Sequence, residues 1–209
     1  DDLALALNEP YRVLVEQRFD IRLPAESEAA AEDIDLVVGR LEEHQLGDGM
    51  LRALESGLDD LREWKQLRLK SGTLPPGKLG THALSSVEDL VKAIHAKGVQ
   101  YRDGKPAEVR AFNNSVSDPS AVITGNAVVY GNRMVITTDA KQKRSRLIAP
   151  WFSIASLTLE YPDTEWEAVV LCSNDDRNNV TEDRYSIAGD SSETRQANAR
   201  KILEFGVDM

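Results

Sequence analysis

The hydrophobic pattern changes its period once along the chain, and this change limits the folds that the sequence can adopt. Before residue 100, apolar residues recur every three or four positions, as in amphipathic helices. After Tyr101 they alternate with polar residues or form short runs rich in Val, Ile and Thr, as in strands. The sequence therefore predicts an α+β fold, with a helical N-terminal hairpin or bundle followed by an antiparallel β-barrel or sandwich closed by a C-terminal helix.

Three helices are predicted in the first part of the chain. An apolar stripe predicts a helix over 27–43, and leucines three and four residues apart predict the longest helix over 51–67. A short helix is expected within 2–19. We expect the turn between the two longer helices near Gln45 to Gly49, with Asp48 as the N-cap of the second.

A change of composition divides the chain. From Ser71 to Gly80 the sequence consists mainly of Gly, Pro and small residues, which sustain neither a helix nor a central strand. We therefore predict a helical domain over 1–72, a linker over 73–84 and a β-rich domain over 85–209.

Two further helices carry clear signals at their ends. Ser85 and Glu88 form a capping box ahead of an apolar stripe, and Gly98 is expected to end this helix. A second capping box precedes a helix over 191–205, which Gly206 is expected to end. The β-rich domain thus begins with one helix and is closed by another.

Five segments between these helices have the composition of strands, and Gly131-Asn132 predicts a two-residue hairpin turn between two of them. The Gly-Asn pairs within 123–132 also resemble the hexapeptide repeat of left-handed β-helices. Two such turns are fewer than the roughly three that a solenoid needs. The predicted strands are 107–112, 121–130, 133–138, 147–160 and 166–172.

Three segments carry a resemblance to a known family. Asn132 to Asp139, Arg146 to Leu157 and Tyr185 to Gly189, followed by the last helix, resemble the bacterial pleckstrin-homology and GRAM-type pattern. The resemblance implies two nearly orthogonal antiparallel sheets closed by the C-terminal helix. It also implies binding of lipid headgroups, peptides or partner proteins, and no enzymatic activity.

The densest basic cluster lies between two predicted strands. Lys141, Lys143, Arg144 and Arg146 are four of six consecutive residues in an otherwise acidic chain. Lys and Arg bind phosphate through charge-assisted hydrogen bonds, so the cluster is the candidate ligand-binding site. The alternative is a solvated hairpin tip without a ligand.

The overall charge is acidic. The formal net charge is −10, and Lys and Arg number 14 against 20 Asp and Glu in residues 1–105, and 11 against 15 in residues 106–209. Nucleic acids and anionic membranes are polyanions, which such a chain repels. We therefore do not expect nucleic acid as a partner, except through a local basic patch.

The single cysteine and the hydropathy indicate a cytoplasmic protein. Cys172 excludes a disulfide within the chain, and the apolar residues before it predict a buried strand in which the thiol is a small apolar group. No apolar run approaches the roughly 18 to 20 residues that span a bilayer, so no integral membrane association is expected. Because the sequence starts at Asp1, removal of an upstream signal stays open.

The sequence carries no recognisable catalytic or metal-binding motif. The three histidines do not have the short spacing of zinc ligands; they are His44, His82 and His95. The run around Asp175-Asp176 lacks the glycine and glutamate of a calcium-binding loop. Motifs for nucleotide binding or hydrolysis are missing as well. We predict no catalytic residue, no metal and no cofactor, although a site assembled from distant residues stays open.

These observations predict a non-enzymatic binding or scaffolding module. It would recognise a protein partner or an anionic ligand, and its helical half could also form a homo-oligomer. The alternative is a nucleic-acid-associated accessory or regulatory subunit that uses the 141–146 basic loop.

Overall fold

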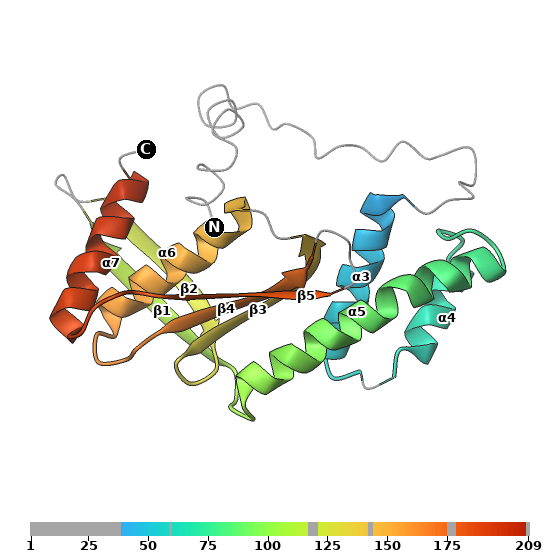
Figure 1. The fold of residues 1–209 in the computed structure, drawn as a ribbon, viewed down its shortest axis with the longest axis horizontal. Helices are drawn as coiled ribbons and strands as arrows, with labels where there is room; N and C mark the ends of the chain where they lie inside the picture. Colours follow the sequence, from blue (N-terminus) through green and yellow to red (C-terminus); the bar gives the residue numbers. More distant parts are fainter. Residues whose placement is uncertain (1–38, 59, 117–120, 142–143, 175–178, 208–209) are drawn as a thin grey trace, which may run out of the picture.

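The described part of the chain contains five helices and two small sheets (Figure 1). The structure is a computed structural model, and it describes residues 39–58, 60–116, 121–141, 144–174 and 179–207. The helix predicted over 2–19 and most of the one over 27–43 lie outside these residues. In chain order the elements are α3 (Arg40–Glu55), α4 (Arg62–Lys70), α5 (Lys78–Arg102), β1 (Glu108–Ser115), β2 (Val122–Val129), β3 (Arg133–Lys141), α6 (Arg144–Glu160), β4 (Glu167–Ser173), β5 (Val180–Ser186) and α7 (Ser192–Val207).

The larger sheet has the strand order β3-β4-β5. β3 runs parallel to β4, with Val135 opposite Val169, and β4 runs antiparallel to β5. Parallel neighbours need a crossover connection, which α6 provides. The α+β class is confirmed, but the prediction of an antiparallel barrel is not: one strand pair is parallel, and the described residues form no closed barrel.

α6 is the central helix on one side of this sheet. The prediction of a strand over 147–160 is wrong, because this segment is helical. α6 contacts the β1–β2 hairpin, the sheet and α7, and Ile154, Ala155 and Leu157 are fully buried. A helix covered on several sides has no continuous polar face, so its sequence can be mistaken for the apolar run of a strand.

β1 and β2 form a separate antiparallel sheet that packs on α6 (Figure 1). The turn predicted at Gly131-Asn132 is confirmed, because Tyr130 and Arg133 exchange backbone hydrogen bonds of 2.7 and 3.2 Å and Gly131 has a φ of 64°. Backbone pairing between β2 and β3 is limited to this bridge between Tyr130 and Arg133. β3 pairs instead with β4, so the turn joins two sheets.

α3 and α4 differ from the helices predicted in their region. α3 continues through Gly47-Asp48-Gly49, so the predicted turn and the N-cap at Asp48 are wrong. The predicted helix over 51–67 is interrupted after Glu55, where Gly57 adopts a φ of 93°. Glycine reaches this left-handed conformation without steric cost, and the chain resumes helical structure only at Arg62.

α5 is the longest described helix and confirms the helix predicted to begin near Ser85. It begins at Lys78, inside the predicted linker, and continues past Gly98 to Arg102. Gly98 is therefore not its end. A side chain at Gly98 would come within 2.9 Å of Thr137 Cγ2, so glycine lets α5 lie close to β3. The helix ends instead at Arg102, and Asp103 after it has a φ of 51°.

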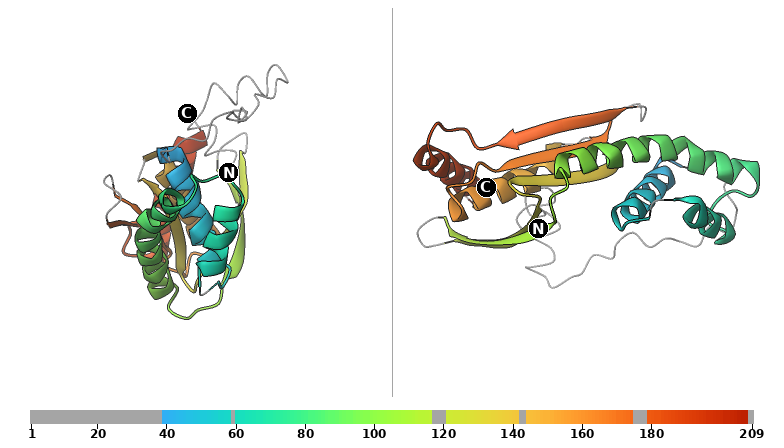
Figure 2. Two further views of the ribbon diagram at one scale, coloured as in Figure 1. Left: turned by 90° about the vertical axis from the view of Figure 1, so that its right-hand side faces the viewer. Right: turned by 90° about the horizontal axis from the view of Figure 1, so that it is seen from below.

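The three-stranded sheet separates two apolar cores (Figure 2). On one face α3 and α5 pack against Val169 and Leu171 of β4. On the other face α6, α7 and the β1–β2 hairpin pack against Met134 and Ala168. Cys172 is buried in β4, as predicted. The division into 1–72, 73–84 and 85–209 stays a prediction.

α7 is the predicted C-terminal helix and lies beside α6. Ser191 caps it, because its Oγ accepts the backbone N–H of Thr194 at 3.2 Å. Gly206 lies inside the helix rather than at its end, and its missing side chain leaves room for Phe152. None of the described helices combines the length and apolarity that crossing a membrane requires.

Candidate functional site

The basic cluster predicted from the sequence lies where β3 leads into α6. Lys141 is the last residue of β3 and is partly buried, and Arg144 and Arg146 belong to the first turn of α6. Lys143 lies outside the described residues. The cluster is therefore a strand-to-helix connection and not the tip of a hairpin between two strands.

This connection lies at the carboxyl end of the parallel strand pair. Lys141 is paired with Ser173, the last residue of β4, so both parallel strands end at the same edge of the sheet. In open α/β units this edge is where ligands usually bind, and the start of the following helix favours anions. Lys141, Arg144 and Arg146 thus lie at this edge of the sheet.

A buried carboxylate lies two residues before Lys141. The Asp139 side chain is fully buried, with Oδ2 3.8 Å from His44 Nδ1 of α3. His44 Nε2 lies 3.9 Å from Asp48 Oδ2, and Asp48 Oδ1 accepts the backbone N–H of Asp139 at 3.3 Å. A side chain at Gly47 would overlap the carboxylate. α3 and β3 are thus held together by polar groups beside the candidate site.

This contact is not visible in the sequence. His44 stands there as an isolated histidine and Gly47 has the pattern of a turn residue, because their partner Asp139 is far away along the chain. Within the described ranges, no three His, Cys, Asp or Glu side chains are grouped so that they could hold a metal ion. The cluster at Asp139 is therefore a contact between α3 and β3.

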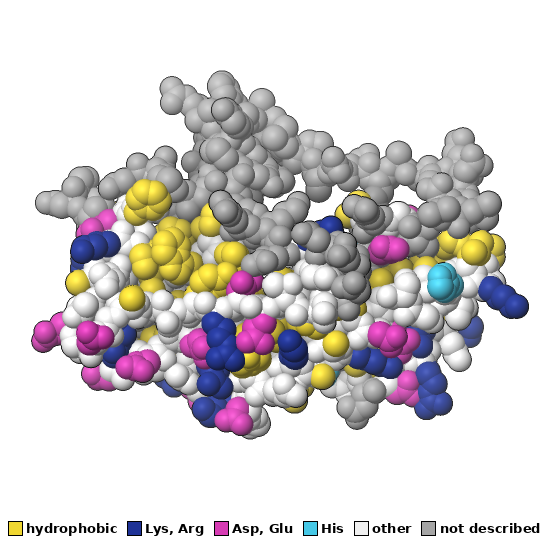
Figure 3. All heavy atoms as spheres, viewed as in Figure 1, with side chains coloured by type: hydrophobic (Ala, Val, Ile, Leu, Met, Phe, Trp, Pro, Cys, Tyr) yellow, Lys and Arg dark blue, Asp and Glu magenta, His cyan; other side chains and the backbone are white. Residues whose placement is uncertain are grey.

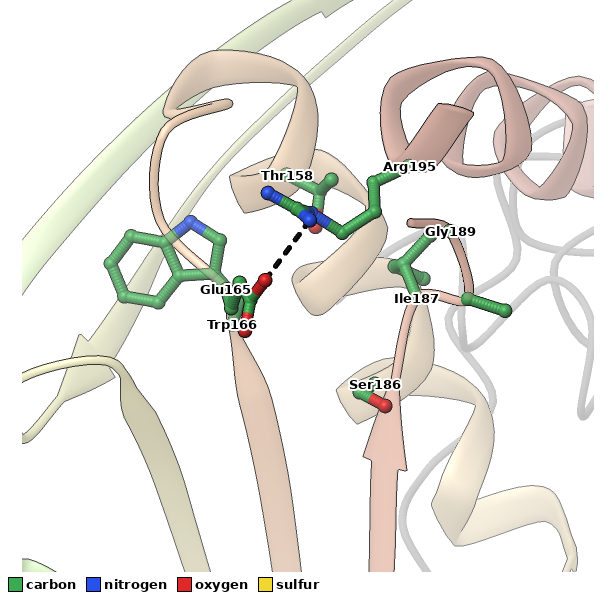
Figure 4. Close-up of a pocket in the computed structure, with 8 residues that line it drawn as sticks. Thr158, Glu165, Trp166, Ser186, Ile187, Gly189 and Arg195 are labelled. Carbon is green, nitrogen blue, oxygen red and sulfur yellow. Dashed lines mark hydrogen bonds and ion pairs between the residues drawn. The ribbon is translucent and has the colours of Figure 1, made fainter. Parts of the chain in front are cut away.

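A pocket of about 250 Å³ lies between α6, α7 and the ends of β4 and β5 (Figure 4). Arg195 of α7 reaches across it, and its Nη1 lies 3.1 Å from Glu165 Oε1. The Arg195 side chain is only 12% exposed, whereas Glu165 is 79% exposed. The ion pair links α7 to the segment before β4. The lining residues are Thr158, Glu165, Trp166, Ser186, Ile187, Ala188, Gly189 and Arg195.

Apolar side chains gather at the α6–α7 end of the molecule (Figure 3). Trp151 of α6 is 38% exposed and Phe205 of α7 is 61% exposed. Aromatic residues with partial exposure are common at protein interfaces. This end of the molecule is therefore more apolar than the face of α5, where Figure 3 shows side chains of both charges.

The comparisons with known proteins agree on one family. A family description, the RecC C-terminal domain, matches residues 1–209. The RecBCD enzyme subunit RecC of Mycobacterium tuberculosis (strain CDC 1551 / Oshkosh) is 27% identical over 165 residues, which are 77% of this chain and 14% of that protein. The subunit of the same name from Mycolicibacterium smegmatis is 28% identical over 173 residues, or 82% and 16%. The chain thus spans less than a fifth of these relatives.

The match overturns the resemblance to pleckstrin-homology and GRAM-type domains, which was wrong. The fold gives the physical reason. The segment from Arg146 to Leu157, which the resemblance interpreted as a strand, belongs to α6, and β3 continues into this helix instead of into an antiparallel neighbour.

Proposed function

The chain belongs to the RecC C-terminal domain family, and we propose on this basis that it is an accessory domain of a nucleic-acid-associated enzyme of the RecBCD type. The sequence-based prediction of a PH-like binding or scaffolding module is wrong, since the curated relatives are named as enzyme subunits. The alternative prediction, an accessory or regulatory subunit, is the one that the match favours.

The position of the 141–146 segment carries the proposal that this domain contacts nucleic acid. Lys141 ends the parallel strand β3, and Arg144 and Arg146 stand in the first turn of α6; basic residues and a helix N-terminus both favour phosphate groups. The acidic charge of the rest of the chain would confine such contact to local basic surfaces.

The proposal includes a cytoplasmic location and protein partners, namely the other parts of a RecBCD-type enzyme. It assigns no catalytic group to this domain. The exposed aromatic residues Trp151 and Phe205 are candidates for the protein contacts.

Charge reversal in the basic segment tests the proposal. The variant Lys143→Glu/Arg144→Glu should bind a fluorescent DNA oligonucleotide about tenfold more weakly in anisotropy titrations, and the slope of log affinity against log salt should fall by about two. The matched control is Arg200→Glu/Lys201→Glu, which changes the net charge equally on the exposed face of α7.

The control should bind as the unchanged chain does. Absence of DNA binding by the unchanged chain at low salt would contradict the proposed function itself. Equal weakening by both variants would mean that net charge, and not the 141–146 segment, governs binding.

A further inference from the structure

Positive charge is concentrated in one stretch of this acidic chain. Residues 60–105 contain nine Lys and Arg against five Asp and Glu, whereas the rest of the chain contains 16 against 30. The stretch comprises α4 and α5, and α4 with the start of α5 forms one end of the molecule (Figure 2). The net charge of residues 1–105 is nevertheless negative, because the first 59 residues are strongly acidic.

Some of these charges are neutralised and fix α4 against α5. Lys65 of α4 and Lys92 of α5 both lie 2.7 Å from the Glu88 carboxylate. Arg62 is paired with Asp60, just before α4. The Lys65–Glu88 pair therefore links α4 to α5, whereas the other two pairs are local, and the charge available to a ligand comes from other residues.

Three exposed basic residues at this end have no ion-pair partner among the described residues: Arg68, Lys70 and Lys78. The Arg68 guanidinium lies 5.2 Å from the centre of the Trp64 ring. Trp64 in turn packs over Gly49 of α3, where a side chain would come within 2.9 Å of the ring. Arg68 thus rests on a fixed aromatic surface. Glu63 is the one exposed acidic residue within α4.

A groove of about 210 Å³ lies between α4 and α5 on the same part of the molecule. Its α5 wall belongs to the first two turns of the helix, and no described side chain caps that N-terminus at Gly77. The free N–H groups of a helix N-terminus add partial positive charge. The groove is lined by Arg62, Lys65, Gln66, Leu69, Thr81, Leu84 and Ser85.

We infer that the α4–α5 end is a second surface for the phosphate backbone of nucleic acid, apart from the 141–146 segment. The local excess of positive charge, the Arg68–Trp64 stack and the uncapped N-terminus of α5 all favour an extended polyanion. This inference rests on the proposed function, because it assigns a further contact of the same domain with nucleic acid.

Charge reversal on α4 tests the inference in the full chain. Arg68→Glu/Lys70→Glu should weaken binding of a single-stranded DNA oligonucleotide about tenfold and lower the salt slope by about 1.5. Arg200→Glu/Lys201→Glu again serves as the control of equal charge. Because Arg68 contacts Trp64, Lys70→Glu/Lys78→Glu provides a second variant that leaves this contact intact and should have a similar effect.

The outcomes separate the inference from the proposed function. If the unchanged chain binds DNA and only the 141–146 variant weakens the binding, the inference of a nucleic-acid surface at the α4–α5 end is overturned and the proposed function stands. If polyglutamate competes as well as unlabelled DNA at equal charge, the surface recognises acidic polymers in general, and the assignment to nucleic acid is overturned.

Discussion

Three helical glycines lie where an element distant in the sequence approaches too closely for a side chain. Glycine inside a helix costs about 1 kcal/mol relative to alanine, so its presence at such positions needs a packing reason. That reason is visible at each of the three positions. Gly47 faces Asp139, Gly98 faces Thr137 and Gly206 faces Phe152.

Replacement of Gly47 by alanine should therefore destabilise the protein, against the usual helix preference. The new methyl group would overlap the buried Asp139 carboxylate and force α3 away from β3. We expect the free energy of unfolding, measured in urea, to fall by about 1–3 kcal/mol. Gln45→Ala, at an exposed position of the same helix, should be close to neutral. A stabilised Gly47→Ala protein would contradict this account of the contact.

These glycines also mark a limit of prediction from sequence. Each was interpreted as a turn or a helix end, because glycine most often has that role. The partners that explain them come from strands or helices elsewhere in the chain. At Gly131 the local rule was sufficient, since the turn depends only on adjacent residues.

At the scale of elements, Glu88 of α5 links this helix to α4 through Lys65, and it also pairs with Lys92 of its own helix. Burial favours the protonated form of Glu88, but the hydrogen bonds from the two lysines outweigh this effect and hold the pKa below its ordinary value of 4.5. The ionised carboxylate is thus favoured in the folded protein. Its contribution to stability is fully present above pH 4.5 and is lost as the pH falls through the lowered pKa.

Glu88→Gln should accordingly lower the melting temperature at neutral pH, with a loss of about 1 kcal/mol for a partly exposed pair of ion bridges. Thermal unfolding followed by circular dichroism between pH 7 and pH 3 should show the difference from the unchanged protein shrinking below pH 4.5. Asp89→Asn changes the neighbouring exposed carboxylate and is the control. A difference that does not vary with pH would exclude the ionised carboxylate as its cause.

Strands were predicted better than helices covered on several sides. The strands β1 to β4 and the helix α7 follow the predicted segments closely, whereas α5 extends beyond both of its predicted ends. α6 did not, because its apolar residues face the hairpin, the sheet and α7 together. β5 was not among the predicted strands, since its alternating polar residues lack the apolar run of a central strand. The basic residues of the candidate site could be found in the sequence, but the parallel pairing of β3 and β4, at whose carboxyl ends they lie, could not.

At the scale of the whole molecule, β4 connects the two cores. Val169 and Leu171 point into the core formed with α3 and α5, whereas Ala168 points into the core around α6. Neither core can be dismantled without exposing one face of this strand. The two cores should therefore unfold together.

Core substitutions test this coupling. Leu84→Ala on α5 and Leu157→Ala on α6 each remove a side chain that is 1% exposed or less, and each should cost about 2–5 kcal/mol. Both should shift a single unfolding transition, seen alike in tryptophan fluorescence and far-ultraviolet circular dichroism. Two separate transitions, each shifted by only one variant, would instead favour independent units like those predicted from the sequence.

A strand that serves two cores cannot easily change its length. Successive residues of β4 point to opposite faces, so inserting or deleting one residue within Glu167–Ser173 would exchange the inward faces of all the residues beyond it. Small residues that now face one core, such as Ala168, would then face the other core, and larger residues such as Leu171 would change cores in the opposite direction. Length variation among relatives of this domain is consequently expected outside β4, whose residue count is set by its two neighbouring layers.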